Sequence, residues 1–449
     1  MSLAPINDVA SHQDRVTATA LPPRLPAFSP PGTAAGVHPP PFLLPGEHFV
    51  AAFVWLAAGA AGLVLVAPQL AAGNIFDPRV LAVTHSVTLG VITTAIFGAL
   101  YQLFPVAMGL AVRSVRLAHL TFWLLQGGVL LVVTGFWLSR GAMQGLGWVV
   151  IALAAVLLGL NLVSQSLAAQ PDPVVGRYVG AGYLSFLAAL GLGSLRIGET
   201  LGYWHVDRLA MIASHFHLAA LGFATCVAIG VGSRMLPMFL VSHGFPRWPI
   251  RWIGPLGGSG LAGFTAGQFS RSSITSLVGI VLMGLAVVLY LFLAFEYFRR
   301  RVRRTLDPGL AHVAVAHLGL GVAVVIGSFV LGTGGLAPRA WAAYALAGLL
   351  GWLVLLIVGV LYKILPFLTW LHLFGQKMGE GPLPTVADLT RPWLGWASLA
   401  CLLAGVTVMV PAVGLGNGPA ARGGAVCFAL GVGLVLAQAG RVLRLRYSR

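Results

Sequence analysis

Apolar runs of about 20 residues recur twelve times between residues 48 and 443. A transmembrane helix needs about 20 mostly apolar residues to cross a hydrocarbon core about 30 Å thick. The composition agrees, because 58% of the 449 residues are hydrophobic and only 8% are charged. We therefore expect an all-α integral membrane protein with twelve transmembrane helices. The expected spans are 48–69, 80–105, 117–138, 146–166, 178–196, 208–236, 250–269, 273–298, 310–332, 340–366, 392–413 and 421–443.

The basic residues predict how the chain is oriented. If the N-terminus lies inside, the inside segments hold 20 of the 27 Lys and Arg residues. The positive-inside rule then places both termini in the cytoplasm, in a membrane of the bacterial inner (plasma) type. The run from Arg299 to Arg304 is interpreted as an anchor at the lipid headgroups, so the net charge of +16 predicts contact with membrane lipids and no nucleic acid partner.

The chain is expected to contain one folded domain. Residues 1–45 are expected to form a disordered cytoplasmic tail, because most of this segment is rich in Pro, Ala and Ser. Residues 46–449 then form a single twelve-helix transmembrane domain.

An internal repeat relates the second, sixth and tenth spans. The segments GALYQLFPVAMG, GVGSRMLPMFLV and GVLYKILPFLTW align on Pro105, Pro237 and Pro366, which recur at nearly equal intervals along the chain. Two glycines precede each proline at the same two offsets, and they are Gly98, Gly230 and Gly359 at the nearer offset and Gly90, Gly222 and Gly351 at the farther one. Such a match predicts three pseudo-repeated four-helix arcs, at about 46–170, 171–300 and 301–449.

The repeated glycines allow two interpretations. Small residues let transmembrane helices approach closely, and the same lack of side chain leaves room for a planar ligand. Gly90 and Gly222 are therefore candidates both for helix packing and for cofactor binding.

Histidines occur at matching depth in two of the three copies. His85 and His217 occupy the same position relative to the repeated proline, where the third copy has Leu346, and His215 precedes His217 in ASHFHLAALGF. An ionisable group within a span is costly unless it has a partner or a function. Three interpretations fit: axial ligands to a haem iron, ligands to copper or zinc, or histidines bonded to carbonyls or interfacial water.

Other histidines are expected to be structural. His312 and His317 begin the ninth span and are interpreted as interfacial residues at the cytoplasmic side. His119 is expected to be solvated in a loop, and His48 is expected to lie in a tail or loop, where the sequence shows no constellation around it.

The stretch ASHFHLAALGFATCVAIGVGSRMLPMF resembles the tenth helix of haem-copper oxidase subunit I, where a His-x-His pair begins the helix on its outer side. The twelve spans and three arcs are also similar to that fold. The resemblance implies haem b, one group or two, with His215 on a high-spin haem and His217 on a low-spin haem. Because THSVTLG resembles the helix that supplies the opposite low-spin ligand, it implies that role for His85.

The sequence departs from this family at the copper site. The His-Pro-Glu motif with its tyrosine and the adjacent His-His pair are absent, so copper and oxygen reduction to water are not expected. The His-x-His helix is the sixth and not the tenth, so the partner of His85 can be either His215 or His217. The chain is also similar to the NnrS-like haem proteins, although their Arg-Pro-Phe-Phe and His-x-His-Glu signatures are absent.

The expected function is that of a membrane b-type cytochrome in electron transfer or in nitric oxide or respiratory metabolism. It would work with a redox partner or other respiratory subunits, and whether it is itself an oxidoreductase stays open. Arg208 and Arg196, near the outer helix ends, are candidates to neutralise haem propionates. A twelve-helix secondary transporter is the alternative, although the expected spans show no mid-membrane carboxylate and the repeat is threefold. A haem-free structural subunit of a respiratory complex is the third candidate.

Overall fold

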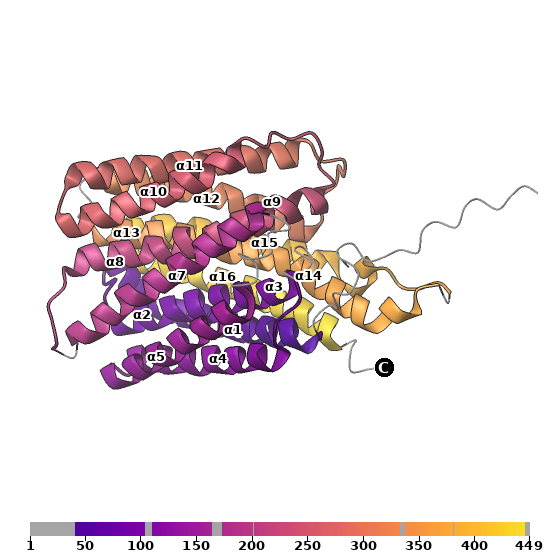
Figure 1. The fold of residues 1–449 in the computed structure, drawn as a ribbon, viewed down its shortest axis with the longest axis horizontal. Coiled ribbons are helices and arrows are strands. Elements are labelled where there is room, and N and C mark those ends of the chain that lie inside the picture. Colours follow the sequence, from indigo (N-terminus) through magenta and orange to yellow (C-terminus); the bar gives the residue numbers. More distant parts are fainter. Residues whose placement is uncertain are drawn as a thin grey trace, which may run out of the picture.

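Residues 41–103, 110–163, 173–200, 202–332, 337–379 and 381–444 are described by the computed structural model, and nearly all of them are helical (Figure 1). The helices are α1 (Leu43–Ala72), α2 (Pro78–His85), η1 (Ser86–Thr93), α3 (Thr94–Leu103), α4 (Val115–Trp137), α5 (Gly141–Leu158), η3 (Gly159–Val163), α7 (Pro173–Thr200), α8 (Arg208–His217), η4 (Leu218–Thr225), α9 (Cys226–Leu240), α10 (Pro249–Ser270), α11 (Ser273–Arg299), α12 (Pro308–Gly332), α13 (Pro338–Leu346), η5 (Ala347–Val354), α14 (Leu355–Phe374), η6 (Gly375–Lys377), η7 (Val386–Leu389), α15 (Pro392–Gly414) and α16 (Gly418–Arg444).

The helices confirm a multi-pass membrane protein. Within the described ranges, eleven helical segments are long and apolar enough to cross a membrane. The expected seventh span, 250–269, forms α10, whose 22 residues are long enough to cross. It is not among the eleven, and its sequence carries many Gly, Ser and Thr residues. Most of the expected tail, and Pro105, lie outside the described residues, and α1 begins at Leu43.

Three long helices share a local distortion. In each, a π-helical stretch of eight residues begins directly after His85, His217 or Leu346. These stretches recur at the spacing of the sequence repeat, because all three stand at the same position relative to the aligned prolines. A π-helix bonds each residue to the one five positions away, is rare, and occurs frequently at functional sites. In two of them a threonine hydroxyl also donates to a carbonyl in the preceding turn, from Thr93 and from Thr225.

The contacts between helices follow the same grouping. α1 packs on α2, η1 and α3, α7 packs on α8, η4 and α9, and α12 packs on α13, η5 and α14. The hairpins α4/α5, α10/α11 and α15/α16 pack along their lengths. Neighbouring groups meet where α5 contacts α7, α11 contacts α12 and α16 contacts α1, so the helices close into a ring.

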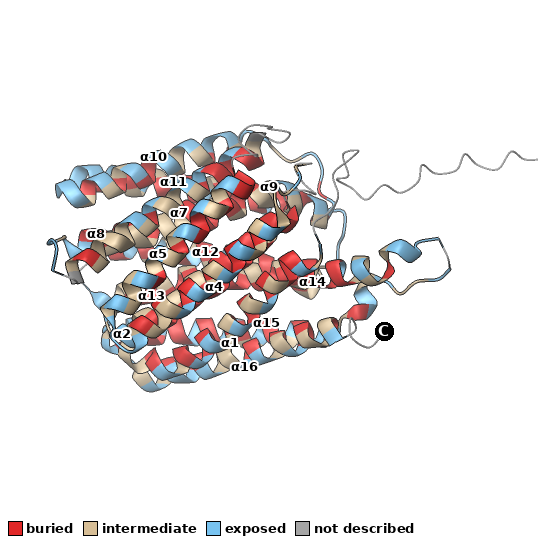
Figure 2. Ribbon diagram, turned by 60° about the horizontal axis from the view of Figure 1, so that its bottom comes forward, coloured by how far each residue is buried: buried red, intermediate tan, exposed pale blue. Residues whose placement is uncertain are grey.

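Burial agrees with a bundle that is surrounded by lipid. Buried residues lie where the helices face one another (Figure 2). Large apolar side chains stand on the outer surface, such as Trp123, which is 67% exposed, Leu184, 66% exposed, and Ile274, 76% exposed. In water such a surface would favour association, whereas lipid tails solvate it.

The bundle has two chemically different sides. We call the side at which α2, α8 and α13 begin the histidine side, because His85, His215 and His217 lie there. The opposite side, at which α3, α9 and α14 end and which carries Arg299–Arg304, is the basic side. In Figure 1 the histidine side is at the left and the basic side, with the C-terminus, at the right.

Candidate histidine site

His85 and His215 lie next to each other on the histidine side. His85 is the last residue of α2, and His215 is in the last turn of α8. Their ring centroids are 6.4 Å apart, and the ring planes are inclined by 39°. The fold therefore brings together two imidazoles from distant parts of the sequence.

Hydrogen bonds define which ring nitrogen carries the proton in each of these histidines. His85 Nδ1 lies 2.8 Å from the carbonyl oxygen of Leu81, and His215 Nδ1 lies 2.9 Å from that of Ala189 in α7. A carbonyl can only accept, so both Nδ1 atoms donate, and a neutral ring then carries its lone pair on Nε2. Neither Nε2 has a hydrogen-bond partner among the residues that the structure describes, and both side chains are only partly buried.

The separation of the two ring centroids is close to the length that one metal ion between two imidazoles requires. Two metal–nitrogen bonds of about 2 Å and two ring radii of about 1.1 Å separate facing imidazole centroids by about 6 Å. The observed 6.4 Å matches this span. A haem iron takes four nitrogens from the porphyrin and has two axial positions, and two histidines can fill both of them.

The surroundings of the pair are largely apolar. Phe136 of α4 stacks on His85, with ring centroids 4.8 Å apart and planes inclined by 20°. Gly193 of α7 lies beside His215, because a Cβ atom built on it would be 3.8 Å from His215 Cε1 and also 3.8 Å from the Trp148 ring. Phe136 was not a sequence candidate, since nothing in the linear pattern marks its contact with α2.

His217 makes different bonds. Its Nδ1 lies 2.7 Å from the carbonyl of Ala213, and its Nε2 lies 3.1 Å from the hydroxyl of Tyr344 in α13. Because Nδ1 donates to the carbonyl, Nε2 accepts the tyrosine proton. The ring is 2% exposed and also contacts Phe264 at 4.8 Å. Both nitrogens of His217 are thus bonded, Nδ1 within α8 and Nε2 across to α13. The sequence repeat contained no sign of Tyr344 as its partner.

The two glycine candidates lie in close helix contacts. A Cβ atom on Gly90 would come within 2.8 Å of three atoms of Trp55 in α1. One on Gly222 would lie 2.7 Å from Leu261 and 2.8 Å from Ser185. Of the two interpretations of these glycines, helix packing describes the neighbours that are present.

Arg208 lies on the histidine side and is 59% exposed. It precedes His215 by about two helical turns, which is about 10 Å along the helix. Its Nε is 3.6 Å from Glu199, and the same carboxylate accepts a 2.9 Å hydrogen bond from Arg196. The two arginines are therefore close enough to share one acid.

Several other histidines are more buried than expected. His48 is on α1 and, like His312, is fully buried, and His317 is 7% exposed, so the interfacial and loop assignments were wrong. Each donates Nδ1 to a carbonyl one turn earlier in its own helix, and this local bond lowers the cost of burying a neutral imidazole. His119 lies on α4, partly exposed, 2.7 Å from Glu47.

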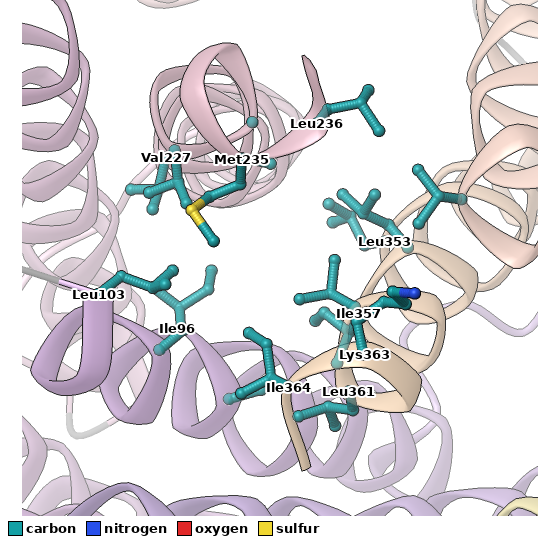
Figure 3. Close-up of a pocket in the computed structure, with 18 of the residues that line it drawn as sticks. Ile96, Leu103, Val227, Met235, Leu236, Leu353, Ile357, Leu361, Lys363 and Ile364 are labelled. Atoms are coloured by element: carbon teal, nitrogen blue, oxygen red, sulfur yellow. The ribbon is translucent and has the colours of Figure 1, made fainter. Parts of the chain in front are cut away.

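An apolar cavity of about 130 Å³ lies between α3, α9 and α14, nearer the basic side (Figure 3). Ile96, Met235 and Leu353 project toward it. Neither His85 nor His215 lines it, and most of its lining is aliphatic. An aliphatic void offers few directional contacts, so we place the candidate chemistry at the histidine pair.

Across the described ranges, no group of three or more His, Cys, Asp and Glu side chains is placed to hold a metal ion. No protein-family model matches the chain, and comparison with the curated proteins finds no match.

Proposed function

We propose that the chain is a haem-binding membrane protein of the haem-copper oxidase subunit I type, in which His85 and His215 are axial ligands of a haem b. The observation that carries this proposal is the adjacent pair of imidazoles, each with Nδ1 bonded to a backbone carbonyl and with Nε2 unbonded among the residues that the structure describes. Bound haem b would supply one-electron transfer, as in a b-type cytochrome of electron transfer or of nitric oxide or respiratory metabolism. Reduction of oxygen to water is not part of the proposal.

The chain's own residues have defined tasks in this proposal. The carbonyls of Leu81 and Ala189 orient the two rings and make them more electron-rich, as bonded carbonyls do for metal-bound histidines in general. The Ala189 bond joins different helices, so α7 holds the ring of His215 in position. Phe136 limits rotation of the His85 ring and shields it from water.

The proposed partner of His85 differs from the one that the family resemblance implied. By resemblance the low-spin pair is His85 with His217, whereas here His215 lies beside His85 and His217 is bonded to Tyr344. We attribute the exchange to helix rotation, because residues two apart on a helix point about 200° apart. We therefore propose one haem, held by His85 and His215. Arg208 is the candidate partner for a propionate of that haem.

The oxidase-like architecture belongs to the same proposal. The three π-helical stretches at the repeat spacing and the ring of helix contacts support three four-helix arcs. The charge distribution supports cytoplasmic termini in a bacterial-type inner membrane, with lipids and respiratory proteins as neighbours.

A reduced-minus-oxidised absorption spectrum of the purified protein tests the proposal, with iron and copper measured on the same sample. We expect Soret and α bands of haem b, about one iron per chain and no stoichiometric copper. Carbon monoxide should leave the reduced spectrum unchanged, because two histidines fill both axial positions. A preparation without iron or a Soret band, made with haem supplied during expression, would contradict the proposal and favour a transporter or a structural subunit.

A further inference from the structure

A second concave site lies at the basic side, where the chain reverses between α9 and α10. It is a surface pocket of about 510 Å³ lined by Pro237, Met238, Val241, Ser242, His243, Gly244, Phe245 and Arg247. α9 ends at Leu240, and Val241 adopts a left-handed backbone conformation with φ 52°. A β-branched residue seldom adopts this conformation, so the surrounding contacts must hold the turn in place.

Contacts with the end of α11 hold the floor of the pocket. Ser242 donates from Oγ to the carbonyl of Tyr297 at 2.7 Å and pairs with Arg301 in an isolated β-bridge. The guanidinium of Arg300 donates to the carbonyl of Gly244 at 2.6 Å. These bonds join the turn after α9 to the end of α11 and hold the pocket in a fixed shape.

The charge at this pocket is strongly positive. Arg247 lines it and Arg251 follows one helical turn later, both are exposed, and neither forms an ion pair with any residue that the structure describes. The nearby carboxylate of Glu296 is already bonded to Arg299 at 2.9 Å and to Arg300 at 2.7 Å. The arginines at the rim thus outnumber the acids and leave unneutralised charge for an anion.

Apolar side chains continue outward from the charged rim. Trp248 is 52% exposed and Trp252 is 58% exposed at the start of α10, and Trp248 lies 6.2 Å from Phe292 of α11. Exposed tryptophans at the end of a membrane span are typical of the headgroup level. The surface therefore combines a basic pocket with exposed aromatic side chains at the start of α10.

We propose that this pocket binds the headgroup of an anionic phospholipid, with the phosphate at Arg247 and the acyl chains along Trp248 and Trp252. Basic pockets between spans on the cytoplasmic side recognise such headgroups through charge and hydrogen bonds. The inference does not depend on haem, because the pocket lies at the opposite side of the bundle from the histidines.

Lipid exchange into nanodiscs tests the proposal. The full-length protein is placed in discs of phosphatidylglycerol and phosphatidylcholine, and the lipids that stay bound after extraction are counted by native mass spectrometry. We expect selective retention of phosphatidylglycerol and about fivefold weaker retention in Arg247→Gln, since one basic residue near the surface contributes about 1 kcal/mol. Arg304→Gln is the control, because it removes an exposed arginine from the same basic side but not from the pocket.

Two results would overturn the proposal. Equal losses in Arg247→Gln and Arg304→Gln would show general attraction to the charged surface without a specific pocket. Displacement of phosphatidylglycerol by inorganic phosphate alone would make free phosphate the ligand. Equal thermal midpoints of the two variants confirm that the comparison concerns binding and not folding.

Discussion

His215 and His217 share one short helix but differ in how completely their nitrogens are bonded. His215 gives Nδ1 to a carbonyl of α7, and its ring lies beside that of His85. His217 gives Nδ1 to its own helix and Nε2 to Tyr344, and its ring is almost completely buried. The first has the bonding of a ligand and the second that of a structural crosslink. The two histidines lie at similar depth, and their hydrogen bonds distinguish them.

The largest expected effect comes from removing either ligand. In His85→Ala or His215→Ala, we expect haem content to fall by at least about tenfold, because one remaining imidazole holds the iron weakly. Quantification of extracted haem per chain measures this. His217→Ala is the matched control and should keep most of its haem; loss of haem in His217→Ala alone would reverse the assignment.

A smaller effect is expected from filling a helix contact beside the site. Gly90→Leu should destabilise the protein by about 3 kcal/mol, because the added side chain overlaps Trp55. Gly348→Leu is the control, because Gly348 lies in the π-helical stretch of the third group and a Cβ atom there meets no atom within 4 Å. Thermal unfolding compares them, and equal midpoints would mean that Gly90 faces open space, as a ligand-lining glycine would.

Removing the hydroxyl that bonds His217 should cost less. Tyr344→Phe leaves a buried Nε2 without its donor, which costs about 1–2 kcal/mol. We expect a lower thermal midpoint with unchanged haem content. Tyr203→Phe, at a residue that is 72% exposed, should change neither quantity; haem loss in Tyr344→Phe would place His217 at the iron.

The smallest effect is expected at Arg208. A positive charge about 10 Å from a haem stabilises its reduced form by about 0.4–1.7 kcal/mol at effective dielectric constants of about 80 to 20. Arg208→Gln should therefore lower the midpoint potential by about 20–70 mV, with haem retained. Potentiometric titration measures the shift, and Arg422→Gln, exposed on α16 in another part of the ring, should leave the potential unchanged.

Much of the fold could be predicted from sequence because the bilayer imposes one helix length. Each of the twelve expected spans falls on a helix, although several helices extend five or more residues beyond the expected ends and α10 is less hydrophobic than the others. The sequence repeat aligned His85, His217 and Leu346, and in the structure a π-helical stretch follows each of these three residues. That distortion itself was not predicted, because nothing in the apolar composition distinguishes i→i+4 from i→i+5 bonding.

The partners within the site could not be predicted. Hydropathy does not define the rotation of a helix whose sides are all apolar, so sequence alone did not distinguish His215 from His217. Phe136, the Ala189 carbonyl and Tyr344 come from helices whose neighbours are decided only by packing. The burial of His48 was not predicted, because a residue near the end of a span was expected to contact water. Its hydrogen bond to the Leu44 carbonyl permits burial.

Electron paramagnetic resonance of the oxidised protein and its variants tests the central claim most directly, because the spin state of the iron shows whether both axial positions are filled. We predict a low-spin ferric signal in the wild type and in His217→Ala. In His215→Ala, any iron that remains should be high-spin, and added imidazole should restore the low-spin signal. A low-spin signal that persists in His215→Ala and disappears in His217→Ala would contradict the pairing of His85 with His215.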